Sequence, residues 1–292
     1  MKKKASGVLP LTKFSNISPY FILTTNPFTF RHAWNYIFTI LNKFFIIQFL
    51  QKLHITRRKV LYVDTQLDDQ IPFMQEKVHD YMQFTNYFVR PISLLISVHG
   101  FFKAYPVINQ YLDFLSLQYS SASKIYKKCM TTTHRPKLTN NTLFRMIHFF
   151  DPHLCCVPSL HVAVCSGVWA WFRNYFEKTP DFPDKEFRLN EIRTLALKIA
   201  ESVLFVKQHS VNCVPMSLYM LTAVTPENFF TTKDAISFFE EMFFDIPDEV
   251  LSSSLKTEIK DHFHFIYEKS LLEHCYDEDW QECIMRWLNN YN

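Results

Sequence analysis

Aromatic side chains are the most restrictive feature of this 292-residue sequence, which contains 30 Phe and 14 Tyr residues. Each ring presents a large apolar area, so a chain with this many rings requires a large hydrophobic core, a membrane, or both. Because 48% of the residues are apolar, the chain is predicted to fold rather than to remain disordered. Its three glycines, Gly7, Gly100 and Gly167, cannot form a glycine-rich nucleotide-binding loop, which excludes those nucleotide-binding folds.

Charge divides the chain into two parts. Residues 227–292 contain fifteen acidic and five basic residues, which gives a net charge of −10. Residues 1–226 contain 13 acidic and 26 basic residues, which gives a net charge of +13. This division predicts a basic, apolar body followed by an acidic, soluble tail.

The acidic tail is predicted to consist of helices. Thr232 can cap a helix over Lys233–Phe243, and Pro247 can open a second helix. The second helix would carry four apolar residues on one face, namely Leu251, Leu255, Ile259 and Phe263. Asp277 is a suitable cap for a third helix that carries Trp280, Cys283, Ile284 and Trp287. His262 and His264 alternate with Phe and are interpreted as packing or helix-surface residues.

Hydropathy leaves two kinds of helical body open. The body contains five apolar stretches, at Trp34–Leu50, Phe84–Phe102, Pro158–Phe172, Leu195–Val206 and Cys213–Val224. Most of them are shorter than a membrane-spanning helix or are interrupted by a charged residue, and the mean hydropathy is only −0.08. Such stretches fit the buried helices of a soluble all-α protein. They also fit a membrane bundle, because charges that face a polar site inside a bundle are tolerated.

Neither a metal site nor a disulfide framework is predicted from the seven cysteines. Their number is odd and the sequence contains no C-x-x-C pair, which argues against a disulfide scaffold. The adjacent Cys155 and Cys156 lie near His153 and His161, but adjacent cysteines chelate one tetrahedral ion poorly. The basic N-terminus is not followed by an apolar segment, so a cleaved signal peptide is not expected.

Three polar segments in the body contain residues suited to phosphate chemistry. In the first, Lys128 precedes Arg135 by seven positions, and Pro136 pushes Arg135 out of a helix into an extended link. A lysine with a forked guanidinium suits a phosphate, although both residue types are also common in ordinary loops. In the second, Pro158 fits the first turn of a helix, which would place Ser159, Leu160 and His161 at an anion-binding helix N-terminus.

His161 and His209 are the candidate catalytic residues. An imidazole titrates near neutral pH, so His161 could protonate a leaving group, although a histidine at a helix start is often a cap or a core residue. The third segment, Lys207-Gln208-His209, interrupts an apolar run, so its side chains are expected to line a site or to end a helix at the surface. If the site exists, His209 could attack phosphorus and form a phosphohistidine.

Taken in order, these segments resemble the three signatures of the type-2 phosphatidic acid phosphatase superfamily. The segments are Lys-x6-Arg-Pro at 128–136, Pro-Ser-Leu-His at 158–161 and Lys-Gln-His at 207–209. The sequence looks most similar to the branch that includes inositol phosphorylceramide synthases, which the stretch 68–73 and Tyr81 also resemble. The resemblance covers roughly residues 60–225 and leaves the acidic tail unexplained.

The resemblance implies an all-α fold, namely a membrane-embedded bundle of about five to six helices followed by the helical tail. On this reading, residues 1–30 form an N-terminal segment, 31–225 the phosphatase-like bundle and 226–292 the tail, and the protein is an integral, multi-pass membrane protein. The implied activity is phosphoryl transfer or hydrolysis on a lipid phosphate or diphosphate, with no metal and no cofactor. The expected partners are the lipid phosphate and the membrane, with no nucleic acid.

Carried over residue by residue, the resemblance makes His209 the nucleophile and His161 the acid. Lys128, Arg135, Ser159 and Leu160 would then form the phosphate-binding group. The sequence departs from the family at Val203, where phosphatases have an Arg, and at Cys213, where the family has an Asp. That Asp orients the nucleophilic imidazole and stabilises its positively charged form. Asn212 could accept a hydrogen bond in place of that Asp, but a neutral amide does not supply its charge.

The change at Cys213 keeps a second function open. The protein could be a catalytically weak or inactive relative that binds anionic lipid headgroups or a partner protein. A third alternative is a soluble helical enzyme similar to haloperoxidases, which share the phosphate-site geometry. If the site exists, the polar atoms of His161, His209 and Arg135 should converge on one phosphate-sized pocket.

Overall fold

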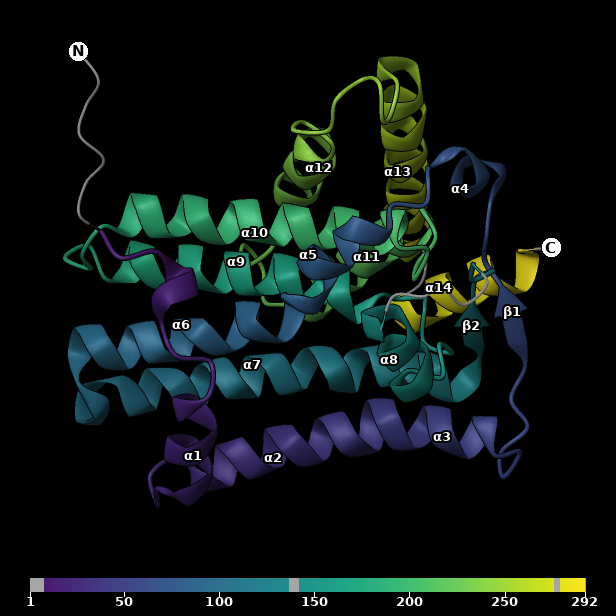
Figure 1. The fold of residues 1–292 in the computed structure, drawn as a ribbon. Coiled ribbons are helices and arrows are strands. Elements are labelled where there is room, and N and C mark those ends of the chain that lie inside the picture. Colours follow the sequence, from purple (N-terminus) through teal and green to yellow (C-terminus); the bar gives the residue numbers. More distant parts are fainter. Residues whose placement is uncertain (1–7, 137–141, 276–278, 292) are drawn as a thin grey trace, which may run out of the picture.

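The computed structural model describes residues 8–136, 142–275 and 279–291. These residues form a layered helical protein, and the described part of the chain adds a single two-stranded parallel sheet (Figure 1). The long helices run side by side across the molecule, and the C-terminal helix ends near the sheet. The all-α class is therefore confirmed, whereas the prediction of a membrane-embedded bundle of about five to six helices is wrong, since the described residues form roughly twice as many helices.

An outer layer is formed by the first helices of the chain. A short 3-10 turn at Leu11–Lys13 and helix α1 (Ser18–Thr25) precede helix α2 (Phe30–Ile40). A π-helical turn η2 (Leu41–Phe45) connects α2 directly to α3 (Ile46–Lys52), and the connecting residues keep helical backbone angles. Residues 30–52 therefore form one continuous helical rod, which packs against α7 (Phe101–Lys128).

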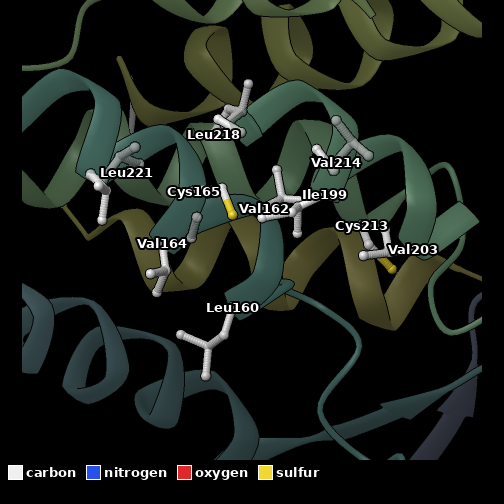
Figure 2. Close-up of a cluster of buried hydrophobic side chains, with 14 of the residues drawn as sticks. Leu160, Val162, Val164, Cys165, Ile199, Val203, Cys213, Val214, Leu218 and Leu221 are labelled. Atoms are coloured by element: carbon white, nitrogen blue, oxygen red, sulfur yellow. The ribbon is translucent and has the colours of Figure 1, made fainter. Parts of the chain in front are cut away.

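The central layer contains the longest helices. Helix α6 (Phe84–His99) ends at Gly100, whose positive φ of 72° turns the chain into α7. Helices α9 (Leu160–Lys178) and α10 (Lys185–Phe205) form an antiparallel pair, and α11 (Cys213–Val224) packs against α9. Figure 2 shows the core between them, where Val162 and Cys165 of α9 meet Ile199 of α10 and Leu218 of α11. This core fixes the ends of α9 and α10, where the predicted site residues lie.

Short elements connect the layers. Strand β1 (Val60–Tyr62) pairs in parallel with β2 (Met130–Thr132), with Val60 opposite Met130. Between β1 and α6 lie α4 (Gln66–Gln70), the turn η3 (Gln75–Lys77) and α5 (Val78–Met82), and β2 is followed by α8 (Thr142–Phe150). Thr131 also forms a parallel bridge with Cys155, so the sheet holds the segment before α9 in place.

The tail forms three helices, with boundaries that differ from the predicted ones. Helix α12 (Thr232–Glu241) begins one residue early because Thr231, not Thr232, forms the capping box with Asp234. Helix α13 (Ser253–His274) is capped by Ser252 rather than opened by Pro247, and Asp279 caps α14 (Trp280–Asn290). The predicted cap Asp277 lies outside the described residues. Ile259 and Phe263 of α13 are buried in the same core as the body.

The prediction of an integral, multi-pass membrane protein is wrong, because none of the described helices combines the length and the apolarity needed to cross a bilayer. The apolar stretches are divided among shorter or more polar elements. The stretch at 84–102 is broken at Gly100, and the stretch at 195–206 is only the second half of α10, whose first half is strongly charged. The stretch at 213–224 forms a helix of only 12 residues.

Candidate functional site

The N-terminus of α9 carries the second predicted segment. Ser159 is the N-cap residue, and its hydroxyl accepts a hydrogen bond from the Val162 N–H at 3.4 Å. The Ser159 backbone N–H in turn donates to the Ser217 hydroxyl of α11 at 2.7 Å. Ser159 and Leu160 are buried, and His161 is half-buried, with its ring packed among neighbouring side chains. The predicted position of these residues at the start of a helix is confirmed.

The loop between α10 and α11 carries His209 and is held by a buried carboxylate. Asp68 of α4 accepts hydrogen bonds from the Ser210 hydroxyl at 2.6 Å and from the Val211 N–H at 2.8 Å. Lys207 has a positive φ of 55°, and its ammonium donates to the backbone carbonyls of Asp68 and Ile71. Residues from α4 and its C-terminal end therefore fix the loop that presents His209.

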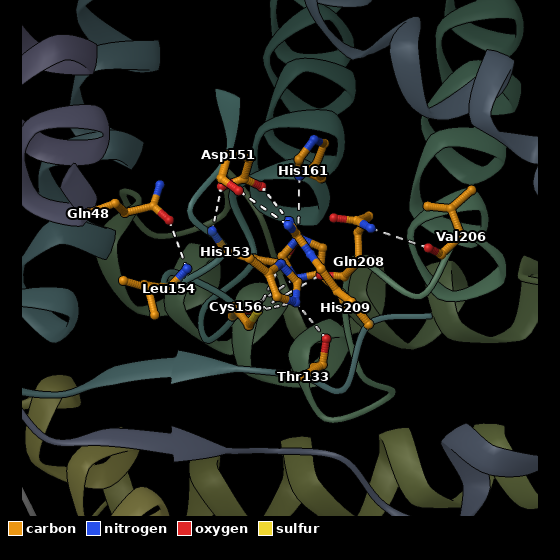
Figure 3. Close-up of polar contacts among 12 residues, drawn as sticks. Gln48, Thr133, Asp151, His153, Leu154, Cys156, His161, Val206, Gln208 and His209 are labelled. Atoms are coloured by element: carbon orange, nitrogen blue, oxygen red, sulfur yellow. Dashed lines mark hydrogen bonds and ion pairs between the residues drawn. The ribbon is translucent and has the colours of Figure 1, made fainter. Parts of the chain in front are cut away.

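The two candidate catalytic histidines meet between these elements. His209 Nε2 lies 3.3 Å from His161 Nδ1 and 3.2 Å from the Ser159 hydroxyl. Their ring centroids are 5.4 Å apart, and Figure 3 shows both rings in one polar cluster with His153 and Asp151. The tertiary structure thus brings together three residues that are up to 50 positions apart in the sequence.

A backbone carbonyl orients the His209 ring. His209 Nδ1 lies 3.3 Å from the carbonyl oxygen of Cys156. Because a carbonyl only accepts hydrogen bonds, this contact places the ring proton on Nδ1 and leaves the lone pair on Nε2. The Cys156 carbonyl therefore sets the tautomer that a nucleophilic imidazole requires. Sequence reasoning missed this group, since a main-chain carbonyl leaves no signal in the sequence.

Arg135 joins the cluster through Asp151. Its guanidinium donates to the Asp151 carbonyl at 3.2 Å and pairs with the Asp151 carboxylate at 3.3 Å. The Arg135 Nε is buried and makes no hydrogen bond within the described residues. Asp151 also accepts from the His153 N–H at 2.9 Å, and His153 Nε2 contacts the Thr133 hydroxyl at 2.7 Å. The guanidinium thus brings positive charge to the cluster while its Nε remains without a partner.

Two other predicted site residues, Lys128 and Asn212, point elsewhere. Lys128 lies at the exposed end of α7, where it pairs with Glu282 of α14 at 2.7 Å. The Asn212 amide donates to the Val63 carbonyl and to the Tyr291 hydroxyl, each at 2.9 Å, and its oxygen contacts His262. Cys213 is fully buried at the start of α11. The structure therefore brings His209, His161, Ser159, Leu160 and Arg135 together, but neither Lys128 nor Asn212 faces the His209 ring.

Burial controls the charge of the histidines. Burial lowers the pKa of His161 to about 3. Burial, followed by the neighbouring His161, lowers the pKa of His209 well below its usual value, and the Arg135 charge adds to this effect. Burial likewise raises the pKa of Asp151, which Arg135 partly offsets. Both imidazoles are therefore neutral near pH 7, which suits a nucleophile and leaves His161 without the proton that an acid requires.

An apolar cavity of about 530 Å³ ends at His161. It lies between α1, the rod 30–52, α6 and α7, and its walls are mainly aromatic and aliphatic. The His161 ring packs on Tyr81 and Phe84 at this wall, with centroid distances of 4.6 and 4.4 Å. A second hollow of only about 10 Å³ lies beside His153, His161 and His209, and has room for about one water molecule. The space between the imidazoles is therefore closed to a phosphate in this conformation.

Within the described residues, no group of three or more His, Cys, Asp or Glu side chains has the arrangement of a metal site. None of the described cysteines forms a disulfide, and Cys155 and Cys156 are buried. Comparison of the chain with protein-family models, with curated proteins and with solved structures finds no match. The resemblance to the phosphatidic acid phosphatases therefore rests on the motif residues alone.

Proposed function

We propose that this protein transfers or hydrolyses the phosphoryl group of a lipid phosphate, with His209 as the nucleophile. One observation carries the proposal: His209 Nε2 faces His161 Nδ1 and the Ser159 hydroxyl, while its Nδ1 is held by the Cys156 carbonyl. Two imidazoles beside a hydroxyl and a guanidinium form a set of groups that can bind and attack a phosphoryl group.

In the proposed reaction, His209 Nε2 attacks phosphorus and the bond between phosphorus and the lipid oxygen breaks. His161 donates a proton to the departing oxygen, which leaves as the lipid alcohol. Water then attacks the phosphohistidine, gives a proton back to His161 and releases inorganic phosphate; an acceptor alcohol in place of water would complete a transfer. Arg135 and Ser159 would stabilise the charge on the phosphoryl oxygens.

Binding of the phosphoryl group would favour the protonated form of His161, which the acid role requires. The pKa of His161 is about 3 because the ring is buried. A bound phosphate brings negative charge against the ring, which favours the protonated form and raises this pKa. The acid role is therefore expected only in the complex with the substrate.

The site must open before it can bind a phosphate. His161 forms part of the wall between the small polar hollow and the apolar cavity. A rotation of the His161 ring toward the cavity would join the two spaces and move this ring away from His209. The joined space would place a phosphoryl group at His209 and a hydrocarbon chain among apolar residues of the cavity, which is why a lipid phosphate is favoured over a water-soluble ester.

The proposal is tested by phosphate release from phosphatidic acid in detergent micelles that contain a chelator, with glycerol 3-phosphate as the water-soluble comparison. His209→Ala should abolish turnover, and His161→Ala should lower kcat by about 10²- to 10⁴-fold. His264→Ala is the matched control, because His264 lies on α13, where it contacts Glu240 and the Phe239 ring. Full turnover in His209→Ala would show that the nucleophile is assigned wrongly.

A second candidate function is phosphate binding without turnover. The burial of Cys213 in place of the expected Asp and the distant position of Lys128 favour it. In that case, vanadate should bind to the wild-type protein and not to Arg135→Met, while neither protein releases phosphate. Phosphate release by the wild-type protein would exclude this alternative.

A further inference from the structure

The outer side of the rod 30–52 exposes apolar side chains. Phe30, Phe38, Leu41 and Ile46 are between 42% and 54% exposed, although they lie on a helix that packs its other side on the protein. Phe30, Trp34 and Phe38 form a row of neighbouring rings, with centroid distances of 6.0 and 5.6 Å. In Figure 1 the rod forms one edge of the molecule, in agreement with the exposure of these side chains.

This exposure is concentrated at one end of the chain. Of the 22 large hydrophobic residues exposed in the described structure, 12 lie between Leu9 and Tyr62. They include Ile17 and Phe21 of α1, which are 63% and 68% exposed. The neighbouring rings of Phe30, Trp34 and Phe38 show that part of this exposure is clustered, and clustered exposed apolar residues indicate an interaction site, whereas isolated ones are normal.

All charged residues of this N-terminal segment are basic. Residues 8–63 contain seven Lys and Arg residues and no Asp or Glu, and the first carboxylate along the chain is Asp64. Arg31 and Lys52 of the rod are exposed. Against the rod, α7 contributes a single carboxylate, Asp113, which pairs with His32 at 2.8 Å. The charged residues of the segment that carries the apolar face are therefore all basic, and Arg31 and Lys52 are exposed on the rod itself.

We infer that α1 and the rod 30–52 form a docking surface for an anionic lipid membrane, on which the rod lies in the interface instead of crossing it. Aromatic and aliphatic side chains would enter the boundary between headgroups and acyl chains, and the basic residues would contact anionic headgroups. A second copy of the chain fits this face less well, because two identical faces would bring like charges together.

The position of the apolar cavity agrees with this inference. Its walls include Tyr20 and Leu23 of α1 and Tyr36, Ile37 and Ile40 of the rod. A lipid chain that enters between α1 and the rod would thus lie in a cavity whose wall also includes His161. This path rests on the proposed function, whereas the docking surface does not.

Co-sedimentation of the full chain with vesicles tests the docking surface. Vesicles of phosphatidylcholine are compared with vesicles in which one third of the lipid is phosphatidylglycerol. The protein should bind the anionic vesicles more tightly, and the double substitution Phe38→Ser, Leu41→Ser should weaken this binding about tenfold or more. Arg31→Glu with Lys52→Glu should remove the preference for anionic lipid and the sensitivity to salt.

The matched control is Phe244→Ser with Phe265→Ser, which removes two exposed rings, 86% and 62% exposed, from the acidic tail. This control should keep wild-type binding, and His209→Ala should also keep it, which separates docking from catalysis. Equal binding by the rod variant and the wild type would overturn the inference. So would a dimer, detected by light scattering without lipid, that Phe38→Ser, Leu41→Ser abolishes, because the face would then join two copies.

Discussion

At the level of single residues, a main-chain carbonyl performs one of the two tasks of the expected carboxylate. The Cys156 carbonyl contacts His209 Nδ1 at 3.3 Å and therefore fixes the ring and its tautomer. It carries no full charge, so it stabilises the imidazolium less than an Asp would. Cys213 does not supply this charge either, because burial raises the pKa of its thiol well above the usual value.

Replacement of Cys213 by Asp should therefore increase turnover if the protein is an enzyme. A carboxylate at this position would add negative charge near His209, and we expect kcat for phosphate release to rise by about tenfold or more. Cys213→Asn is the control, since it has nearly the same size without the charge. Equal rates in the two variants would show that charge at this position does not limit the reaction.

The buried histidines predict a loss of stability in acid. The pKa of His161 is about 3 in the folded protein and about 6.5 in an unfolded chain. At pH values between these two, the unfolded chain binds a proton that the folded protein does not. The free energy of unfolding is therefore highest above about pH 6.5 and falls as the pH decreases. Each such histidine contributes up to about 1.4 kcal/mol per pH unit.

Urea unfolding at a series of pH values between about 7 and 4 measures this effect, with the pH range set by the two pKa values. The free energy of unfolding should fall less steeply with acidification in His161→Gln than in the wild-type protein. His32→Gln, on the surface beside Asp113, is the control. Parallel curves for wild type and His161→Gln would contradict the assignment of a neutral, buried His161.

At the level of elements, the close packing of α7 on α9 positions the helix that presents His161. A Cβ atom added to Gly167 of α9 would lie 2.8 Å from both amide atoms of Gln118 on α7. Gln118 is fully buried, so its side chain has little room to move. The glycine is therefore required for the approach of the two helices and not for backbone flexibility.

Gly167→Ala should lower the free energy of unfolding by about 1–3 kcal/mol because it overpacks this contact. Gln118→Ala in the same chain removes the clashing amide and should recover much of the loss. Chemical denaturation of the two single variants and the double variant gives the coupling between the positions. If the two losses simply add, the contact between Gly167 and Gln118 is not the cause.

At the level of the whole molecule, the acidic tail is part of the same core as the basic body. Phe263 of α13 is fully buried, and α13 packs against α11. Tyr291, which follows α14, donates to the Asp64 carbonyl at 2.6 Å, and Glu282 holds Lys128. The tail thus contacts the sheet and the segment that follows His209.

Phe263→Ala should therefore destabilise the whole molecule and not the tail alone. We expect a loss of about 3–5 kcal/mol, with one unfolding transition that is the same by helical circular dichroism and by tryptophan fluorescence. Phe265→Ala on the same helix is the control, because this ring is exposed and its removal should change stability by less than about 0.5 kcal/mol. Two separate transitions would show that residues 226–292 form an independent domain.

Some features of the candidate site follow from local sequence. Pro158-Ser159-Leu160-His161 has the chemistry of a helix start, and Ser159 does cap α9. The order of the three polar segments also identified His161 and His209 as candidate residues, and these two rings lie side by side in the structure. The spacing between Lys128 and Arg135 fits the motif, but the Lys128 ammonium pairs with Glu282 of α14. The spacing within a motif contains no information about a helix that lies far away in the sequence.

The helical class, the approximate helices of the tail and the division of charge could be predicted before the fold was known, because they depend on neighbouring residues and on composition. Whether the apolar stretches cross a membrane or pack on one another followed only from the folded arrangement, since each stretch is compatible with either environment. The same holds for the Cys156 carbonyl on His209 and for the direction of Lys128 and Asn212. Contacts between distant segments depend on how helices pack, which local residue patterns do not encode.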